Sequence, residues 1–134
     1  MIVCVAVSLT ACAVKQYVGE PFDYSASGVC KCPTLPAECQ VPTKHFDFTF
    51  KVAQLSPETY QIEGESQVAK NLQSLGQIQT GTFTFLLAKD GKVIDNVIVN
   101  PHGDLWSTLP FKKEFTSKEG FDGIMVTYNI SYRQ

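Results

Sequence analysis

Four residues with redox-active or metal-binding side chains lie close together in the first third of the chain. The order is Cys30-Lys31-Cys32, then Cys39, then His45. In an oxidising compartment one disulfide is the expected outcome, joining Cys39 to either Cys30 or Cys32. A bond between Cys30 and Cys32 would close a strained loop around one residue. The alternative is a zinc site of three thiolates and the His45 imidazole, although C-x-C departs from the usual C-x2-C spacing. We favour the disulfide and expect no metal or other cofactor.

A second group of polar and aromatic side chains follows Asn100, where Pro101 and Gly103 predict a loop. His102 and Asp104 are two residues apart and can approach each other there, but no nucleophile stands in a matching motif. We therefore expect no enzyme activity. Trp106 would be a good binding anchor if exposed, and would otherwise cap one end of the domain. His102, Asp104 and Trp106 are the candidates for partner binding.

Charge and composition exclude several further functions. The formal net charge is -2, and the longest basic run is Lys112-Lys113. Nucleic-acid binding calls for a clustered basic face, so no nucleic-acid partner is expected. The glycines are isolated, which argues against a phosphate-cradling loop.

The chain begins with an uncharged, mostly apolar stretch that ends at Leu9-Thr10-Ala11-Cys12. An apolar residue, two small residues and a cysteine resemble the lipobox of bacterial lipoproteins. The resemblance implies that residues 1–11 are a signal peptide, and that Cys12 carries a diacylglycerol and acyl chains such as palmitate. Two or more acyl chains give stable membrane attachment. No Lys or Arg precedes Cys12, so we expect the natural start to lie upstream. The alternative is an apolar strand over residues 1–14 with a buried Cys12.

The resemblance also implies a location. Ala13, not aspartate, follows the cysteine, which in enteric-type lipoproteins implies the outer membrane. The protein would be held there by lipid, facing the periplasm or the cell surface. No segment has the roughly 20 apolar residues of a spanning helix.

Residues 12–44 are predicted to form the lipid anchor and a tether. Prolines at positions 21, 33, 36 and 42 remove backbone donors and argue against a helix or a central strand. The tether would hold the domain away from the membrane.

Residues 45–134 are predicted to be the folded domain. Apolar side chains alternate from Phe46 to Val52 and from Ile124 to Tyr132, as in half-buried strands. Asp90-Gly91, between two β-rich runs, predicts a tight hairpin with Phe83, Phe85 and Leu87 in the core. A further strand is expected over 109–116, with Phe111 and Phe115 buried.

The strand rhythm predicts an all-β, two-sheet antiparallel sandwich, immunoglobulin-like or transthyretin-like, of about six to seven strands. We expect an envelope lipoprotein whose non-catalytic sandwich docks an envelope protein partner. The alternative is a lipoprotein that binds a metal or small ligand through the cysteines and His45, or through the loop from His102 to Trp106. The predicted fold alone does not decide between protein docking and ligand binding.

Overall fold

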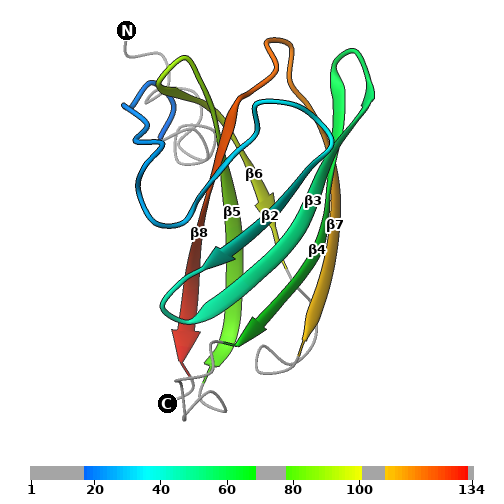
Figure 1. Ribbon diagram of the computed structural model, residues 1–134. Helices are drawn as coiled ribbons and strands as arrows, with labels where there is room; N and C mark the ends of the chain where they lie inside the picture. Colours follow the sequence, from blue (N-terminus) through cyan, green and yellow to red (C-terminus); the bar gives the residue numbers. More distant parts are fainter. Residues whose placement is uncertain (1–16, 69–77, 101–107, 133–134) are drawn as a thin grey trace, which may run out of the picture.

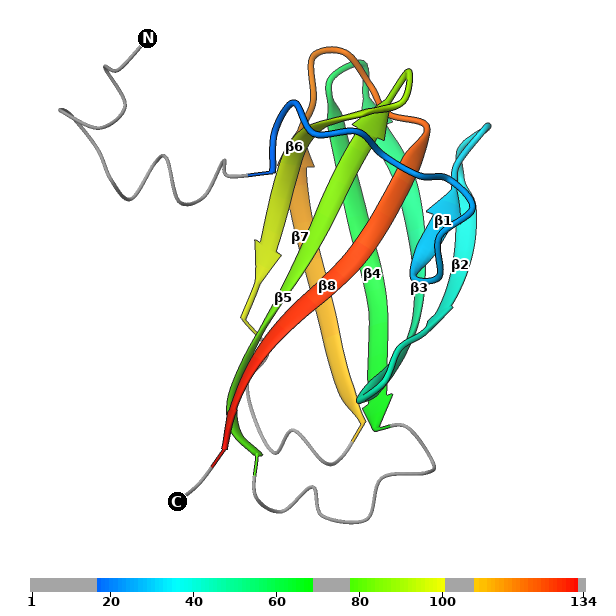
Figure 2. The same ribbon diagram turned by 90° about the vertical axis from the view of Figure 1, so that its left-hand side faces the viewer.

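The computed structural model describes residues 17–68, 78–100 and 108–132, which form a β-sandwich (Figures 1 and 2). This confirms the predicted fold class, with eight strands where six to seven were expected. One sheet has the order β1-β8-β5-β6 and the other β2-β3-β4-β7, and every pairing is antiparallel. The strands are β1 (Val29–Lys31), β2 (Ala37–Pro42), β3 (Phe46–Ser56), β4 (Thr59–Val68), β5 (Ile78–Lys89), β6 (Lys92–Val99), β7 (Leu109–Thr116) and β8 (Gly123–Tyr132). Within the described residues, no helix has the length and apolarity to cross a bilayer.

The period-two pattern of β3 places one of its faces in the core, as predicted. Phe46, Phe48, Phe50 and Val52 of β3 are all buried, and the side chains between them are more exposed. β8 lies between β1 and β5, so the long last strand pairs on both sides.

The β5–β6 hairpin turns at Asp90 and Gly91, with φ values of 52° and 83°. Positive φ at both central residues is the mark of a type I′ turn, whose twist matches the flanking strands. Phe83, Phe85 and Leu87 each have 0% exposure, so the predicted core face is confirmed.

Aromatic rings fill the space between the sheets. The ring centroids of Phe48 and Phe83 lie 4.9 Å apart and those of Phe50 and Phe85 5.3 Å apart, both edge to face. This geometry suits the ring quadrupoles and adds to the apolar burial. Phe111 is buried, as predicted, whereas Phe115 is only half-buried.

A second, smaller apolar cluster lies on the outer face of the first sheet. Phe22 covers Leu86, Ala88 and Val93 there, and Tyr17, Tyr24, Val29 and Met125 pack around them. An added Cβ at Gly123 would lie about 3.0 Å from the ring of Tyr24 and 3.1 Å from that of Phe22. The bare backbone at this position therefore lets both rings approach the sheet closely.

Backbone hydrogen bonds fix the same segment to β6. Gly19 donates to Val93, Val93 donates to Glu20, and Phe22 donates to Gly91, at 2.8–2.9 Å. These bonds, and the strands β1 and β2 within residues 29–42, show that most of the predicted tether belongs to the folded domain. β1 and β2 are short strands at sheet edges, where proline is tolerated. Neither has the long alternation that identified β3 and β8.

The sandwich has two distinct ends. We call one end the entry pole, because residues 17–22 join the sandwich there (Figure 2). It contains the β3–β4 turn, the β5–β6 turn and residues 117–122. The far pole carries the β2–β3 turn at 43–45, the end of β8, and the strand ends that flank residues 69–77 and 101–107 (Figure 1).

Candidate functional site

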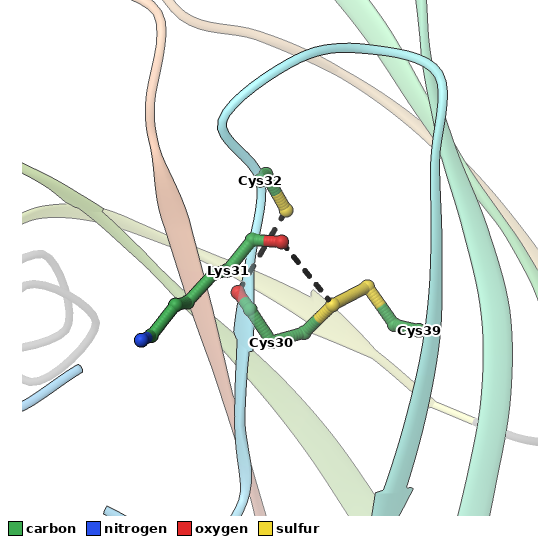
Figure 3. The surroundings of a disulfide bond; sticks show 4 residues. All are labelled: Cys30, Lys31, Cys32 and Cys39. Carbon is green, nitrogen blue, oxygen red and sulfur yellow. Dashed lines mark hydrogen bonds between the residues drawn. A yellow bond between two sulfur atoms is a disulfide. The ribbon is translucent and has the colours of Figure 1, made fainter. Parts of the chain in front are cut away.

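The cysteine cluster lies where the two sheets meet at one side of the sandwich. β1 is an edge strand of the first sheet and places Cys30 opposite Ile124, whereas β2 is an edge strand of the second and places Cys39 opposite Phe50. A disulfide joins Cys30 to Cys39 across a Cα–Cα distance of 5.7 Å (Figure 3). The bond therefore links one sheet to the other. Of the two predicted pairs with Cys39, the structure contains the one with Cys30.

Cys32 carries a free thiol with only 2% exposure. Its sulfur lies 3.7 Å from the carbonyl oxygen of Cys30, and its backbone N–H donates to Asp122 at 2.9 Å. Burial, followed by the negative charge of Asp122, raises the pKa of the Cys32 thiol to about 11. At neutral pH the group is therefore a protonated, poorly nucleophilic thiol.

The sulfur atoms of Cys30, Cys32 and Cys39 all lie within 4.8 Å of one another. Within the described residues this is the one group of three or more candidate metal ligands. While the disulfide is closed, the group offers a single thiol and not three thiolates. The geometry instead brings a thiol nucleophile next to a disulfide.

The structure does not bring His45 to this cluster. His45 lies five residues before Phe50, the register partner of Cys39, and five residues of strand span about 17 Å. Its Nδ1 lies 2.7 Å from the Tyr128 hydroxyl, to which its backbone N–H also donates at 3.0 Å. The four-ligand zinc set considered from the sequence is not assembled.

Tyr24 and Asp122 form a hydrogen-bonded pair at the entry pole that the sequence did not predict. The Tyr24 hydroxyl donates to Asp122 at 2.5 Å and accepts from the backbone N–H of Gly91 at 3.1 Å. The other carboxylate oxygen of Asp122 accepts from Asp90 N–H at 3.3 Å. Burial and the hydrogen bond to Asp122 raise the pKa of Tyr24. Since the Asp122 carbonyl also accepts from Cys32, this residue connects the tyrosine pair to the cysteine cluster.

The open side between β6 and β7 contains a groove toward the far pole. It is lined by the end of β6 with Asn100 and by the β7 residues Pro110, Phe111, Lys112 and Lys113. Both strands are sheet edges. The groove therefore combines an apolar floor with two exposed lysines.

The other sequence candidates lie outside the described residues. These are Cys12 of the lipobox-like motif and the partner-binding candidates His102, Asp104 and Trp106. The last three fall in the segment that connects the two strands flanking the groove.

Comparison of the chain with protein-family models, with curated proteins and with solved structures finds no match. The functional argument therefore rests on the residues and their arrangement.

Proposed function

We propose that this protein is a lipid-anchored envelope lipoprotein whose non-catalytic sandwich docks an exported protein partner. The supporting observation is the closeness of the fold to the lipobox-like Cys12. Only residues 13–16 separate Cys12 from Tyr17, which packs against the sandwich. Five residue steps span at most about 18 Å. A lipid on Cys12 would therefore hold the entry pole close to the membrane.

Two further observations favour export and docking. A disulfide that links the two sheets is expected in an oxidising compartment. The far pole would point away from the membrane, and the groove is lined by the ends of β6 and β7 that lie toward this pole. Exposed strand edges and an apolar groove beside lysines suit a protein partner. Residues 101–107, with His102, Asp104 and Trp106, connect the groove-lining strands and would contribute to that contact.

The anchor is tested by the intact mass of the protein from the membrane fraction, after alkylation without reduction. We expect a chain that begins at acylated Cys12, with one alkylated thiol and one disulfide. Cys12→Ser is the matched control and should leave the chain uncleaved and unacylated. An unmodified N-terminus in the unaltered protein would refute the anchor.

Docking is tested by photo-crosslinking in living cells. A photoreactive amino acid at Lys112 lies at the groove, and one at the exposed Lys31 lies on edge strand β1, on the other side of the sandwich. We expect one defined envelope protein to crosslink at position 112 and not at 31. Equal crosslinking at both positions, or none at any groove position, would argue against a docking groove.

A metal-binding lipoprotein is the second candidate, favoured by the three sulfurs within 4.8 Å of one another. It requires the reduced form, because two of the three sulfurs otherwise form the disulfide. Zinc or copper(I) bound stoichiometrically after reduction, and lost in Cys32→Ala, would support it. Equal metal content in that variant and the unaltered protein would refute it.

A further inference from the structure

The three cysteines have the arrangement that an internal exchange reaction needs. The Cys32 sulfur lies within 4.8 Å of both atoms of the Cys30–Cys39 disulfide. Figure 3 shows Cys30 and Cys32 on one stretch of chain, joined by Lys31, and Cys39 on the neighbouring stretch. A thiolate exchanges with a disulfide by attacking one of its sulfur atoms. Here the nucleophile and the disulfide belong to one chain and are already close.

We propose that this cluster is a thiol–disulfide exchange site in which Cys32 displaces Cys30 from Cys39. Cys32 loses its proton to solvent, and its thiolate forms a bond to the sulfur of Cys39. The Cys30–Cys39 bond breaks, and Cys30 leaves as a thiolate that takes up a proton. One disulfide and one thiol are present before and after, so no oxidant or reductant is consumed.

The chain connectivity selects Cys39 as the sulfur that is attacked. Attack on Cys30 would produce a Cys30–Cys32 bond around a single residue, which is strained. A Cys32–Cys39 bond still joins the β1 region to β2, and so still links the two sheets. The closed loop changes only from a sequence separation of 9 to one of 7. Loop-closure entropy depends weakly on length, so the two pairings differ little in that respect.

The exchange moves the free thiol to a more accessible place. Cys32 is buried, whereas Cys30 is half-buried on an edge strand. A released Cys30 thiolate can attack a disulfide of another exported protein. It forms a mixed disulfide and expels the second sulfur of that protein as a thiolate. The partner class, which rests on the export proposed above, is a disulfide-bearing exported protein that is captured covalently through Cys30.

Burial sets the rate of the first step. Because the pKa of Cys32 is raised to about 11, only a small fraction of the thiol is ionised at neutral pH. The thiolate fraction, and with it the exchange rate, increases about tenfold for each pH unit below that pKa. The site is slow at rest and becomes faster with pH or with local opening of the β1–β2 region.

Trypsin separates the two pairings cleanly. Cleavage after Lys15, Lys31 and Lys44 places Cys30 alone in peptide 16–31 and both Cys32 and Cys39 in peptide 32–44. The Cys30–Cys39 form yields two linked peptides. The Cys32–Cys39 form yields a free peptide 16–31 and an internally bonded peptide 32–44. Cys4 and Cys12 fall in peptide 1–15 and do not interfere.

The experiment treats the native full chain with N-ethylmaleimide at pH 7.5 and pH 9. The sample is quenched in acid, the remaining thiols are blocked in denaturant with an isotopically labelled reagent, and the digest is mapped by mass. We expect N-ethylmaleimide added to the native protein (the native label) on Cys30, with an internal disulfide in peptide 32–44. The labelling rate should be at least tenfold higher at pH 9 than at pH 7.5. Native label on Cys32 with the two peptides still linked would overturn the proposal. So would no native label on Cys30 at pH 9.

Variants separate loss of the nucleophile from loss of packing. Cys32→Ala and Cys32→Ser should each abolish native labelling of Cys30. Val41→Ala removes a buried side chain from β2 but retains Cys32, so labelling of Cys30 should persist or become faster. Thermal unfolding identifies which Cys32 variant is folded. Unchanged labelling of Cys30 in a folded Cys32 variant would also overturn the proposal.

Discussion

At the residue scale, Gly64 is a position in the second sheet where a side chain would meet neighbouring backbone. It faces the core from β4, opposite Phe50 of β3. An added Cβ would lie 2.1 Å from the carbonyl oxygen of Thr49 and 2.5 Å from the Cα of Phe50. Backbone atoms cannot move aside as a flexible side chain can. We expect Gly64→Ala to lower the free energy of unfolding by about 2–3 kcal/mol, measured by urea denaturation.

Gly91→Ala is the matched comparison. Gly91 has a φ of 83°, but an added Cβ there would meet nothing within 4 Å. The cost is then conformational only, about 1 kcal/mol. Equal losses for the two variants would show that the contact at Gly64 relaxes and is not a fixed backbone approach.

The buried thiol of Cys32 gives a defined pH dependence. Its pKa is raised from 9.0 to about 11 in the folded protein, so the unfolded chain loses this proton first. Between about pH 9 and pH 11 the unfolded state binds fewer protons, and the free energy of unfolding decreases with pH. Below pH 9 this contribution is fully present. We expect Cys32→Ala to lose less stability between pH 8 and pH 10.5 than the unaltered protein, measured by urea midpoints. Identical losses would contradict the assignment.

At the scale of elements, residues 17–28 behave as part of the first sheet. Phe22 is 7% exposed and covers the outer faces of β5 and β6. We expect Phe22→Ala to cost about 2–4 kcal/mol and to loosen this segment while the sandwich stays folded. The measurement is hydrogen exchange at the Gly19 amide, which donates to the Val93 carbonyl, and at the Val93 amide, which donates to the Glu20 carbonyl. Val18→Ala, at a side chain 42% exposed, should leave both amides protected.

The elements that the sequence predicted are those with long, regular patterns. β3, β8 and the β5–β6 hairpin follow from alternation and from Asp90-Gly91, because side-chain period and turn chemistry are local properties. The folding of residues 17–42 was not predicted. β1, with three residues, is too short to show a period. β2 does alternate, with Cys39 and Val41 buried and the residues between them exposed, but the run is short and ends at Pro42. A further signal was available, since Leu86 and Ala88 make β5 apolar on both faces. A strand of that kind needs a cover on its outer face.

The sequence predicted which residues could form the cysteine cluster, but not how they pair. The spacing limited the disulfide to two pairs and left His45 as a possible fourth metal ligand. The choice of Cys30 depends on the register of β1 against β8, which places Cys30 opposite Ile124. The exclusion of His45 depends on the register of β2 against β3, which places Cys39 opposite Phe50. Register is set by the whole sheet and not by nearby residues.

At the scale of the whole molecule, the disulfide holds the two sheets together on one side. Closing a loop of about nine residues is worth about 2.5 kcal/mol in the chain-entropy description. The exchange site predicts that removing Cys39 and removing Cys30 have unequal effects on stability. Cys39→Ser should lose the whole of that stabilisation, since both unstrained disulfides include Cys39. Cys30→Ser should retain a disulfide between Cys32 and Cys39, and lose clearly less. Urea midpoints with and without a reducing agent measure both, and equal losses would argue against the alternative pair.

The orientation of the sandwich on a membrane follows from the short span between Cys12 and Tyr17. Leu55 is 50% exposed and lies on the β3–β4 hairpin at the entry pole, whereas Lys44 lies in the β2–β3 turn at the far pole. Between them β3 spans about 33 Å. In lipidated protein with Trp106→Phe, bound to vesicles of brominated phospholipid, we expect quenching of tryptophan fluorescence in Leu55→Trp and little in Lys44→Trp. Inserting 15 Gly and Ser residues after Ala13 should remove that difference, because the tether would then no longer restrict the pole. Equal quenching at the two positions without the insertion would contradict a fixed orientation while leaving the anchor itself intact.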